Sequence, residues 1–414
     1  MRKFFVLMLV LMLSLTMVSV GALADIKLVN NKPEISAPLT TYADDYSKSH
    51  DFKVNVVTAG GSVDYEAALK AEFANEAPDI FAITGPAMYE TFKDYIADQS
   101  AEAWAAYTSN AYVDADGKVV GFPVAIEGYA LAYNGDILAK AGIDPATLTN
   151  ASAFRAAVEK LDAMKAELGL DAVISMVSSS AAGMTWVTAE QNFNVYLSAG
   201  LPYGDETYIN MFLEGKVDPE RFHAYCQYVD LLFKYADQNI LVTGTQDMQL
   251  ASFANGKTAF YHQGNWMDPN LVSLGVSFPM GYIPFSFLDT DMTGIMISAP
   301  SWYVINKQSA NYDECAQFLN DMVGTAEGQK YMMVDAAMIP AFTNVEGTIS
   351  SPLSAAVMQW NRDGQNYAWQ QYKMPSGFPK GNMAPIYELL ASRAIDADTF
   401  ETMMIEAIAG VPSL

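Results

Sequence analysis

The chain has 414 residues, of which 23 are Lys or Arg and 47 are Asp or Glu, and its formal net charge is −24. A summed field of this sign repels nucleic acid, anionic lipid and polyanionic substrates, so we expect none of these as partners. A neutral or a cationic ligand is compatible with it.

The first 24 residues predict an export signal. Arg2 and Lys3 precede an unbroken apolar run over residues 4–13, and Ala22-Leu23-Ala24 is an A-x-A cleavage site. We expect cleavage after Ala24 and a protein free in the periplasm or secreted, since no Cys near the junction is available for lipidation. The alternative is an uncleaved membrane anchor, because about 20 apolar residues suffice to span a bilayer. The mature chain of 390 residues (414 minus 24) is long enough for two lobes.

Strand-like and helical runs alternate along this mature chain, which is typical of an α/β fold with a parallel sheet. The loops that follow such strands are where open α/β sheets bind ligands. No Pro/Gly/Ser-rich linker is present, so short crossings must join the lobes. We predict strands at 52–57, 79–83 and 302–306, and helices at 65–75, 88–96, 153–168, 312–323 and 387–409.

The stretch 121–144, GFPVAIEGYALAYNGDILAKAGID, carries the most specific pattern. It resembles the crossover segment of the extracellular solute-binding proteins of sugar-importing ABC transporters, the maltodextrin-binding-protein type. Residues 77–81, 253–266 and 302–340 resemble further segments of that family in the same order. Together these motifs are specific for the family but carry no information about the ligand. The family's aromatic pair after the first strand is absent, so contacts there must come from Asn30, Asn31 or Lys32.

The resemblance implies a two-lobed α/β periplasmic-binding-protein fold, type II-like, with the ligand cleft between lobes joined by hinge crossings. Residues 25–126 and 286–338 would form the first lobe, and residues 127–285 and 339–414 the second. It further implies a monomer that is not an enzyme, needs no cofactor or metal, captures an oligosaccharide by hinge closure, and delivers it to ABC transporter permease subunits in the membrane.

Aromatic and polar residues near the expected cleft are the candidates for ligand contact, because sugar rings pack on aromatic faces while their hydroxyls need fixed polar partners. Trp266 follows a strand in a Gly-Asn-Trp turn, and Glu127 follows the Gly-Phe-Pro strand, where it could accept hydrogen bonds from the ligand. The alternatives are core packing for Trp186 and Trp266, a surface hinge position for Glu127, and helix capping for Asp64. Trp369 lies in the same poorly patterned region as Trp360. The candidate ligand-binding residues are Asn30, Asn31, Asp64, Tyr65, Glu127, Tyr129, Trp186, Asn265, Trp266, Trp302 and Trp360.

Other classes of protein have weaker support in the sequence. Residues 255–258 mimic the end of a P-loop, but Ala251 stands where that motif needs Gly. The three histidines have no metal-ligand spacing, and no Gly-x-Ser-x-Gly elbow occurs. A secreted carbohydrate-cleaving enzyme remains an alternative, since aromatic residues with two carboxylates also describe a glycosidase cleft. A non-sugar solute such as a polyamine or a peptide is a second one. Cys226 and Cys315 form either a disulfide or two buried thiols.

Overall fold

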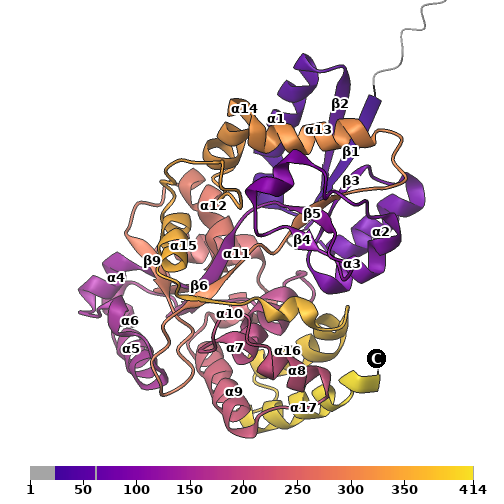
Figure 1. The fold of residues 1–414 in the computed structure, drawn as a ribbon. Coiled ribbons are helices and arrows are strands. Elements are labelled where there is room, and N and C mark those ends of the chain that lie inside the picture. Colours follow the sequence, from indigo (N-terminus) through magenta and orange to yellow (C-terminus); the bar gives the residue numbers. More distant parts are fainter. Residues whose placement is uncertain (1–23, 61–62, 414) are drawn as a thin grey trace, which may run out of the picture.

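The computed structural model describes residues 24–60 and 63–413, and it consists of two lobes, each built around a six-stranded sheet (Figure 1). The two-lobed α/β architecture expected from the sequence is therefore confirmed. The predicted signal segment lies outside the described residues except for Ala24, which opens the first strand. Within the described ranges, no helix has both the length and the apolar character needed to cross a membrane.

The first lobe contains a mixed sheet. Its strands, in spatial order, are β2 (Phe52–Thr58), β1 (Ala24–Asn30), β3 (Ile80–Ile83), β11 (Trp302–Ile305), β5 (Val119–Pro123) and β4 (Tyr112–Val113). β1 pairs in parallel with β2 and β3, as the alternation of strands and helices predicts. β11 is antiparallel to both β3 and β5, because the chain enters β11 from the second lobe and runs back across the sheet.

Helices cover both faces of this first sheet, because successive residues of a strand point to opposite sides. Leu28 packs into the same cluster as Leu39 and Leu319, whereas its neighbour Val29 packs into a second cluster with Leu69 and other residues. The helices are α1 (Ser36–Ser49), α13 (Tyr312–Gly324) and α14 (Ala326–Lys330), with α2 (Tyr65–Asn75) and α3 (Pro86–Phe92) on the opposite face.

The second lobe is organised around one central strand, β6 (Glu127–Asn134), which is antiparallel to each of its partners. The other strands are β7 (Ile174–Ser175), β8 (Phe260–Gly264), β9 (Met280–Ile283), β10 (Ile295–Ser298) and β12 (Asn366–Tyr367). The order is β12-β10-β6-β8-β7, with β9 also paired to β6. The helices are α4 (Gly135–Lys140), α5 (Ala151–Ala163), α6 (Lys165–Leu168), α7 (Phe193–Ser198), α8 (Thr207–Leu213), α9 (Pro219–Lys234), α10 (Gln238–Thr243), α11 (Gln246–Ala254), α12 (Asp268–Ser273), α15 (Pro352–Arg362), α16 (Ala384–Ala391) and α17 (Ala397–Ala409).

The predicted strands and the predicted helices 65–75 and 312–323 coincide with observed ones. The predicted helix 88–96 is α-helical only to Phe92, where α3 ends and a 3-10 segment, Lys93–Tyr95, follows. Two further helix predictions need correction. The prediction of one helix over 387–409 is wrong, because α16 ends at Ala391 and α17 begins at Ala397. Arg393 adopts a left-handed φ of 59° between them, and the Asp396 carboxylate caps α17. The segment 153–168 is likewise divided between α5 and α6.

Three segments cross between the lobes side by side and form the hinge. The first, residues 124–126, joins β5 to β6. The Val124 amide donates to the carbonyl of Ser301 (2.9 Å), and the Ile126 amide donates to the carbonyl of Ile339 (2.8 Å). Ser301 lies on the second crossing and Ile339 on the third, so backbone hydrogen bonds tie all three together.

The lobe boundaries of the structure differ from the predicted ones at two of these crossings. Residues from 286 onward were expected in the first lobe, but β10 pairs with β6 in the second sheet, so the chain crosses only at 299–301. The third crossing extends from Ile339 to at least Thr343, whose amide still donates to the carbonyl of Tyr107 in the first lobe (2.8 Å). The pattern of residues along the chain predicts where a strand lies, but it does not predict which sheet that strand joins.

Cys226 and Cys315 are both free and buried, which contradicts the disulfide alternative. Cys226 lies on α9 in the second lobe and Cys315 on α13 in the first. Burial raises the pKa of both thiols, so they remain protonated and act as small apolar side chains.

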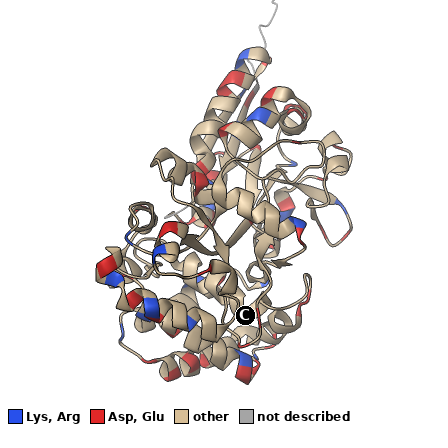
Figure 2. Cartoon of the chain, turned by 90° about the vertical axis from the view of Figure 1, so that its left-hand side faces the viewer, with Lys and Arg blue, Asp and Glu red and all other residues tan. Residues whose placement is uncertain are grey.

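Charged residues occur on the helices of both lobes (Figure 2), and acidic residues are more numerous than basic ones in the sequence. The net charge of −24 is thus spread over the molecule. The resulting field favours the approach of cations and opposes that of anions.

Candidate functional site

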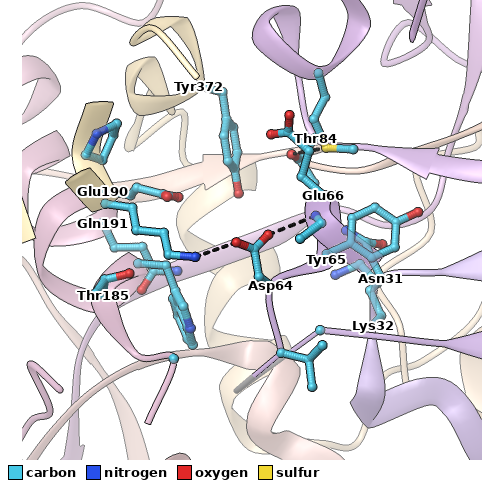
Figure 3. Close-up of a pocket in the computed structure, with 18 of the residues that line it drawn as sticks. Asn31, Lys32, Asp64, Tyr65, Glu66, Thr84, Thr185, Glu190, Gln191 and Tyr372 are labelled. Carbon is cyan, nitrogen blue, oxygen red and sulfur yellow. Dashed lines mark hydrogen bonds and ion pairs between the residues drawn. The ribbon is translucent and has the colours of Figure 1, made fainter. Parts of the chain in front are cut away.

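A cavity of about 880 Å³ lies between the two lobes (Figure 3). The first lobe lines it with the loops after β1, β2 and β3 and with the N-terminus of α2. The second lobe lines it with the π-helical segment Trp186–Asn192, with Trp266 after β8, and with residues between 369 and 380. The first-lobe loops follow the carboxyl ends of parallel strands, as expected for a ligand site in an open α/β sheet. The volume lies within the range of about 300 to 1,000 Å³ that is usual for ligand pockets.

Four aromatic side chains, Trp186, Trp266, Trp369 and Tyr372, line the second-lobe side of the cavity, and we call them the aromatic wall. The Trp266 ring is at its centre, 6.4 Å from the Trp186 ring and 6.2 Å from the Trp369 ring, edge to face with both. The Trp369 and Tyr372 ring centroids are 5.8 Å apart. Such a wall offers flat apolar faces to a ligand ring.

Buried residues of the second lobe hold the aromatic wall in place. The Trp266 indole nitrogen donates to Gln263 Oε1 (2.9 Å), and its ring lies so close to Gly264 that any side chain there would collide with it. Tyr129 packs edge-on against Trp369 at 4.8 Å and donates its hydroxyl to the carbonyl of Gln191 (3.1 Å). Tyr129 therefore supports the wall from behind and has no face in the cavity.

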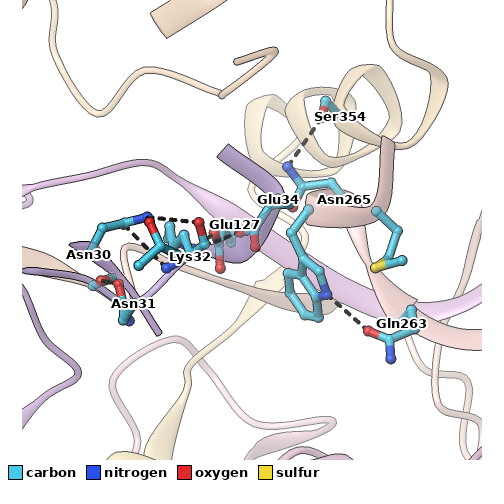
Figure 4. A network of polar contacts seen from close by, with 12 residues as sticks. Asn30, Asn31, Lys32, Glu34, Glu127, Gln263, Asn265 and Ser354 are labelled. Carbon is cyan, nitrogen blue, oxygen red and sulfur yellow. Dashed lines mark hydrogen bonds and ion pairs between the residues drawn. The ribbon is translucent and has the colours of Figure 1, made fainter. Parts of the chain in front are cut away.

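At the base of the cavity, the ammonium group of Lys32 is ion-paired to Glu127 and lies 3.5 Å from Glu34 (Figure 4). Lys32 and Glu127 are each only 7% exposed, and they join the first lobe to the first residue of β6 in the second sheet. Burial alone would lower the pKa of Lys32, but the two carboxylates raise it above its ordinary value. The Asn30 side-chain amide donates to the Lys32 carbonyl (2.8 Å), which fixes this turn.

At the mouth of the cavity, polar contacts connect the two lobes directly. The Asp64 carboxylate caps α2 by accepting from the Ala67 amide (3.1 Å), and it is also ion-paired to Lys380 of the second lobe. The Ser376 hydroxyl donates to Glu66 Oε2 at 3.0 Å. These groups are exposed, so each contact contributes about 1 kcal/mol or less to closure.

Glu190 is the one carboxylate of the cavity lining that has neither an ion pair nor a side-chain hydrogen bond within the described part of the chain. It lies on the π-helical segment and faces Asp64 across the cavity (Figure 3). Burial, reinforced by the negative charge of Asp64, raises the pKa of Glu190 to about 7. The Oε1 atom of the adjacent Gln191 also lacks a partner.

The structure brings six of the eleven candidate residues to the cavity: Asn31, Asp64, Tyr65, Glu127, Trp186 and Trp266. Several of these are already engaged within the protein. The Tyr65 hydroxyl donates to the carbonyl of Ala82 (3.0 Å), and Asn31 Oδ1 accepts from the hydroxyl of Ser301 (2.9 Å). Tyr65 thus presents mainly its ring to a ligand.

Five candidate residues do not line the cavity. Asn30 is buried in the turn after β1, and Tyr129 lies behind the aromatic wall. The Asn265 side chain accepts from the Gly128 amide (2.9 Å) and lines a small pocket at the hinge. Two tryptophans lie elsewhere: Trp302 donates its indole N–H to the carbonyl of Asn110 (2.7 Å), and Trp360 packs on α15 against the second-lobe core.

Several cavity residues were missing from the candidate set, and their sequence signals differ in strength. Glu190 is the only charged residue of the sequence between Asp171 and Asp205, and such an isolated charge in a helical run is a signal for a polar site. Trp369 and Tyr372 stand three residues apart, the spacing of one helical face, in a region without clear periodicity. Lys380 carries no local signal, because its place in the site depends on the approach of the two lobes.

The sequence profile of a known family, described as bacterial extracellular solute-binding protein, matches residues 41–359. The chain belongs to this family. The family expected from the stretch 121–144 is thereby confirmed at this level. A comparison of the solute-binding protein with curated protein sequences found no match.

Solved structures that resemble this solute-binding protein establish its fold over nearly the whole chain. A chitin oligosaccharide binding protein has a TM-score of 0.75 at 16% identity, covering 95% of this chain and 100% of that one. The binding protein RafE in complex with raffinose has a TM-score of 0.74 at 17% identity, with 94% and 100% covered. A sugar transporter protein from Bacillus licheniformis in complex with stachyose has a TM-score of 0.73 at 17% identity, again with 94% and 100% covered.

The carboxyl of Glu190 predicts a pH effect on the unliganded solute-binding protein. Because the pKa of Glu190 is raised from its ordinary value of 4.5 to about 7, the native state holds a proton that the unfolded state releases. Stability linked to this group therefore falls as the pH rises through that window. We expect Glu190→Gln to raise the free energy of unfolding at pH 8 and to leave it unchanged at pH 4.

Urea unfolding of the wild type and of Glu190→Gln across pH 4–8 checks this expectation. The charged and titratable groups that face residue 190 are the same in the wild type and in the variant. They are Asp64, Lys380 and Tyr372. His262, whose pKa burial lowers to about 3, costs stability below about pH 6.5 in both, so its contribution cancels in the difference. A difference that does not vary with pH would contradict the assignment.

Proposed function

We propose that this protein captures a soluble oligosaccharide between its two lobes and presents the closed form to the permease subunits of an ABC importer. The observation that carries the proposal is the interlobe cavity of about 880 Å³ with its aromatic wall on one side and fixed polar groups on the other. Sugar rings pack on aromatic faces, and their hydroxyl groups bind to fixed polar partners. The protein acts outside the cytoplasm as a monomer, after cleavage of the signal segment behind Ala24.

The names of the similar structures support a saccharide as the ligand. They were solved with raffinose or stachyose bound, or are described as binding chitin oligosaccharides. These saccharides differ in linkage and composition. The shared feature is therefore an oligosaccharide-sized ligand, and we propose the same class here.

Most carboxylates of the cavity are already ion-paired within the protein, which favours a binding protein over a carbohydrate-cleaving enzyme. A glycosidase needs two free carboxyl groups on opposite sides of the scissile bond. Here Glu127 is ion-paired to Lys32, and Asp64 is ion-paired to Lys380, which leaves Glu190 without an opposing free carboxylate in the described cavity lining. This arrangement supports a binding protein and argues against the carbohydrate-cleaving alternative.

A thermal-shift screen of oligosaccharides tests the proposed function. A ligand present at 100 times its dissociation constant should stabilise the protein by about 2.7 kcal/mol, which raises the melting temperature by several degrees. The screen should contain raffinose, stachyose, maltotetraose, cellotetraose and chitin tetrasaccharide. The same mixtures should show no new reducing ends after long incubation. Absence of any shift, or release of reducing ends, would contradict the proposal.

Closure of the lobes around the ligand gives a second expected result. The exposed contacts at the mouth are too weak to hold the unliganded protein closed, whereas a ligand that touches both lobes stabilises the closed state. We expect saturating saccharide to reduce the radius of gyration while the circular dichroism spectrum stays the same. Small-angle scattering with and without the ligand measures this. Equal radii at demonstrated saturation would contradict hinge closure.

A further inference from the structure

The charges that line the cavity do not balance. Among the described lining residues, five carboxylates face three ammonium groups. Each ammonium group is already engaged: Lys380 with Asp64, Lys70 with Glu66 (2.7 Å), and Lys32 with both Glu127 and Glu34. Glu190 is left without a counter-ion.

Two side chains near Glu190 have buried polar atoms without hydrogen-bond partners, which indicates that a ligand binds in this part of the cavity. Gln191 is 5% exposed and Trp369 is 8% exposed, yet Gln191 Oε1 and the Trp369 indole nitrogen have no hydrogen-bond partner in the described structure. Both side chains line the cavity. Buried polar atoms without partners are costly, so a ligand is expected to satisfy them. The segment that carries Glu190 is π-helical, an irregularity that is common at functional sites.

An unpaired carboxylate beside aromatic faces suits a cation better than a neutral group. The aromatic wall presents ring faces that attract a cation through their quadrupole, and the carboxylate supplies the counter-charge. Glu190 lines the same cavity as Tyr372 and lies on the π-helical segment that also carries Trp186, so the carboxylate is on the same side of the cavity as the wall. Beside a neutral hydroxyl Glu190 holds its proton up to about pH 7, whereas an ammonium group stabilises the ionised carboxylate and forms a charge-assisted hydrogen bond with it.

We propose that the saccharide captured by this protein carries a protonated amino group, which binds between the Glu190 carboxylate and the aromatic wall. The amine forms a charge-assisted hydrogen bond to Glu190, and Gln191 Oε1 offers a second acceptor. This inference rests on the proposed function, because it specifies the class of saccharide. It also accounts for the acidic excess of the whole chain, which attracts a cationic ligand.

Matched saccharides that differ only in one substituent test the proposal by calorimetry at pH 6.5. Chitosan tetrasaccharide carries a free amine at C2 of each ring, chitin tetrasaccharide a neutral amide, and cellotetraose a hydroxyl at the same positions of one backbone. Kanamycin, compared with raffinose and maltotriose, extends the comparison to α-linked rings. Spermidine serves as a cation without a sugar ring.

We expect an amino saccharide to bind at least about tenfold more tightly than its neutral counterparts. In Glu190→Gln, which removes the charge but keeps the shape, this preference should fall below about threefold. Glu220→Gln is the matched control, because Glu220 is exposed on α9 and does not line the cavity, so the same loss of net charge should leave the preference unchanged. The comparison of amino and neutral saccharides on the wild type tests the preference for an amine even if a variant fails to fold.

The remaining outcomes separate this inference from the proposed function. A neutral saccharide that binds as tightly as the amino saccharides would overturn the inference and leave the proposed function standing. Binding of spermidine alone, or of no member of the panel, would overturn both. A preference for amines that persists in Glu190→Gln would overturn the role of Glu190.

Discussion

Replacing Lys32 by Met is expected to lower the free energy of unfolding by about 3 to 5 kcal/mol. The substitution removes the only cation beside Glu127 and Glu34 in the described structure, and it leaves the buried Glu127 carboxylate next to the partly buried Glu34 carboxylate at the hinge. An uncompensated buried charge is far more costly than the ion pair itself is favourable. Urea unfolding at pH 7 measures the loss.

Two further variants separate the charge effect from a packing effect. Glu127→Gln leaves Lys32 with Glu34 as a partner, so its loss of stability should be clearly smaller. The double variant Lys32→Met/Glu127→Leu removes both charges of the closest pair and should recover much of the stability lost in the single variant, because apolar replacements of a buried ion pair are often neutral. Equal losses in all three variants would refute a charge-based explanation.

Replacing Trp266 by Ala is expected to weaken saccharide binding by about 30-fold, the effect of losing roughly 2 kcal/mol at a central binding residue. The indole lies at the centre of the aromatic wall and lines the cavity directly. Since the same ring packs against Tyr129, we also expect a loss of about 3 kcal/mol in the free energy of unfolding. Calorimetric titration and urea unfolding measure the two effects separately.

Trp360→Ala provides the matched control for this variant. Trp360 is a partly buried tryptophan of the same lobe, but it lies on α15 and outside the cavity. It should lose stability and keep its affinity at a temperature where the variant is folded. If Trp266→Ala binds the saccharide as tightly as the wild type, the aromatic wall is not the ligand platform.

The α/β character could be predicted from the alternation of strand-like and helical runs, whereas the two-lobed arrangement was predicted from the resemblance to a known family. The buried strand β6 and the helix α4 that Asn134 caps both follow from the sequence of 121–144. The lobe boundary at 286 could not be predicted, since the sheet that β10 joins depends on pairing with β6 far away in the chain. Local pattern does not encode such long-range pairing.

The candidate site was predictable only in part, for a related reason. Residues that follow strands or open helices, such as Asp64 and Trp266, have positions set by local structure. Lys380 reaches Asp64 only when the two lobes approach each other, and Trp369 belongs to a segment with little regular structure. Conversely, Trp302 was a candidate because it is aromatic, but it lies in the first-lobe sheet. Its indole N–H donates a hydrogen bond to the carbonyl of Asn110 and is not available to a ligand.

A crystal structure of the protein with the tightest-binding saccharide of the screen tests the central claim most directly. We expect one saccharide in the interlobe cavity, with a sugar ring lying on Trp266 and with contacts to both lobes. A saccharide bound elsewhere on the molecule, with the interlobe cavity empty at saturation, would contradict this account.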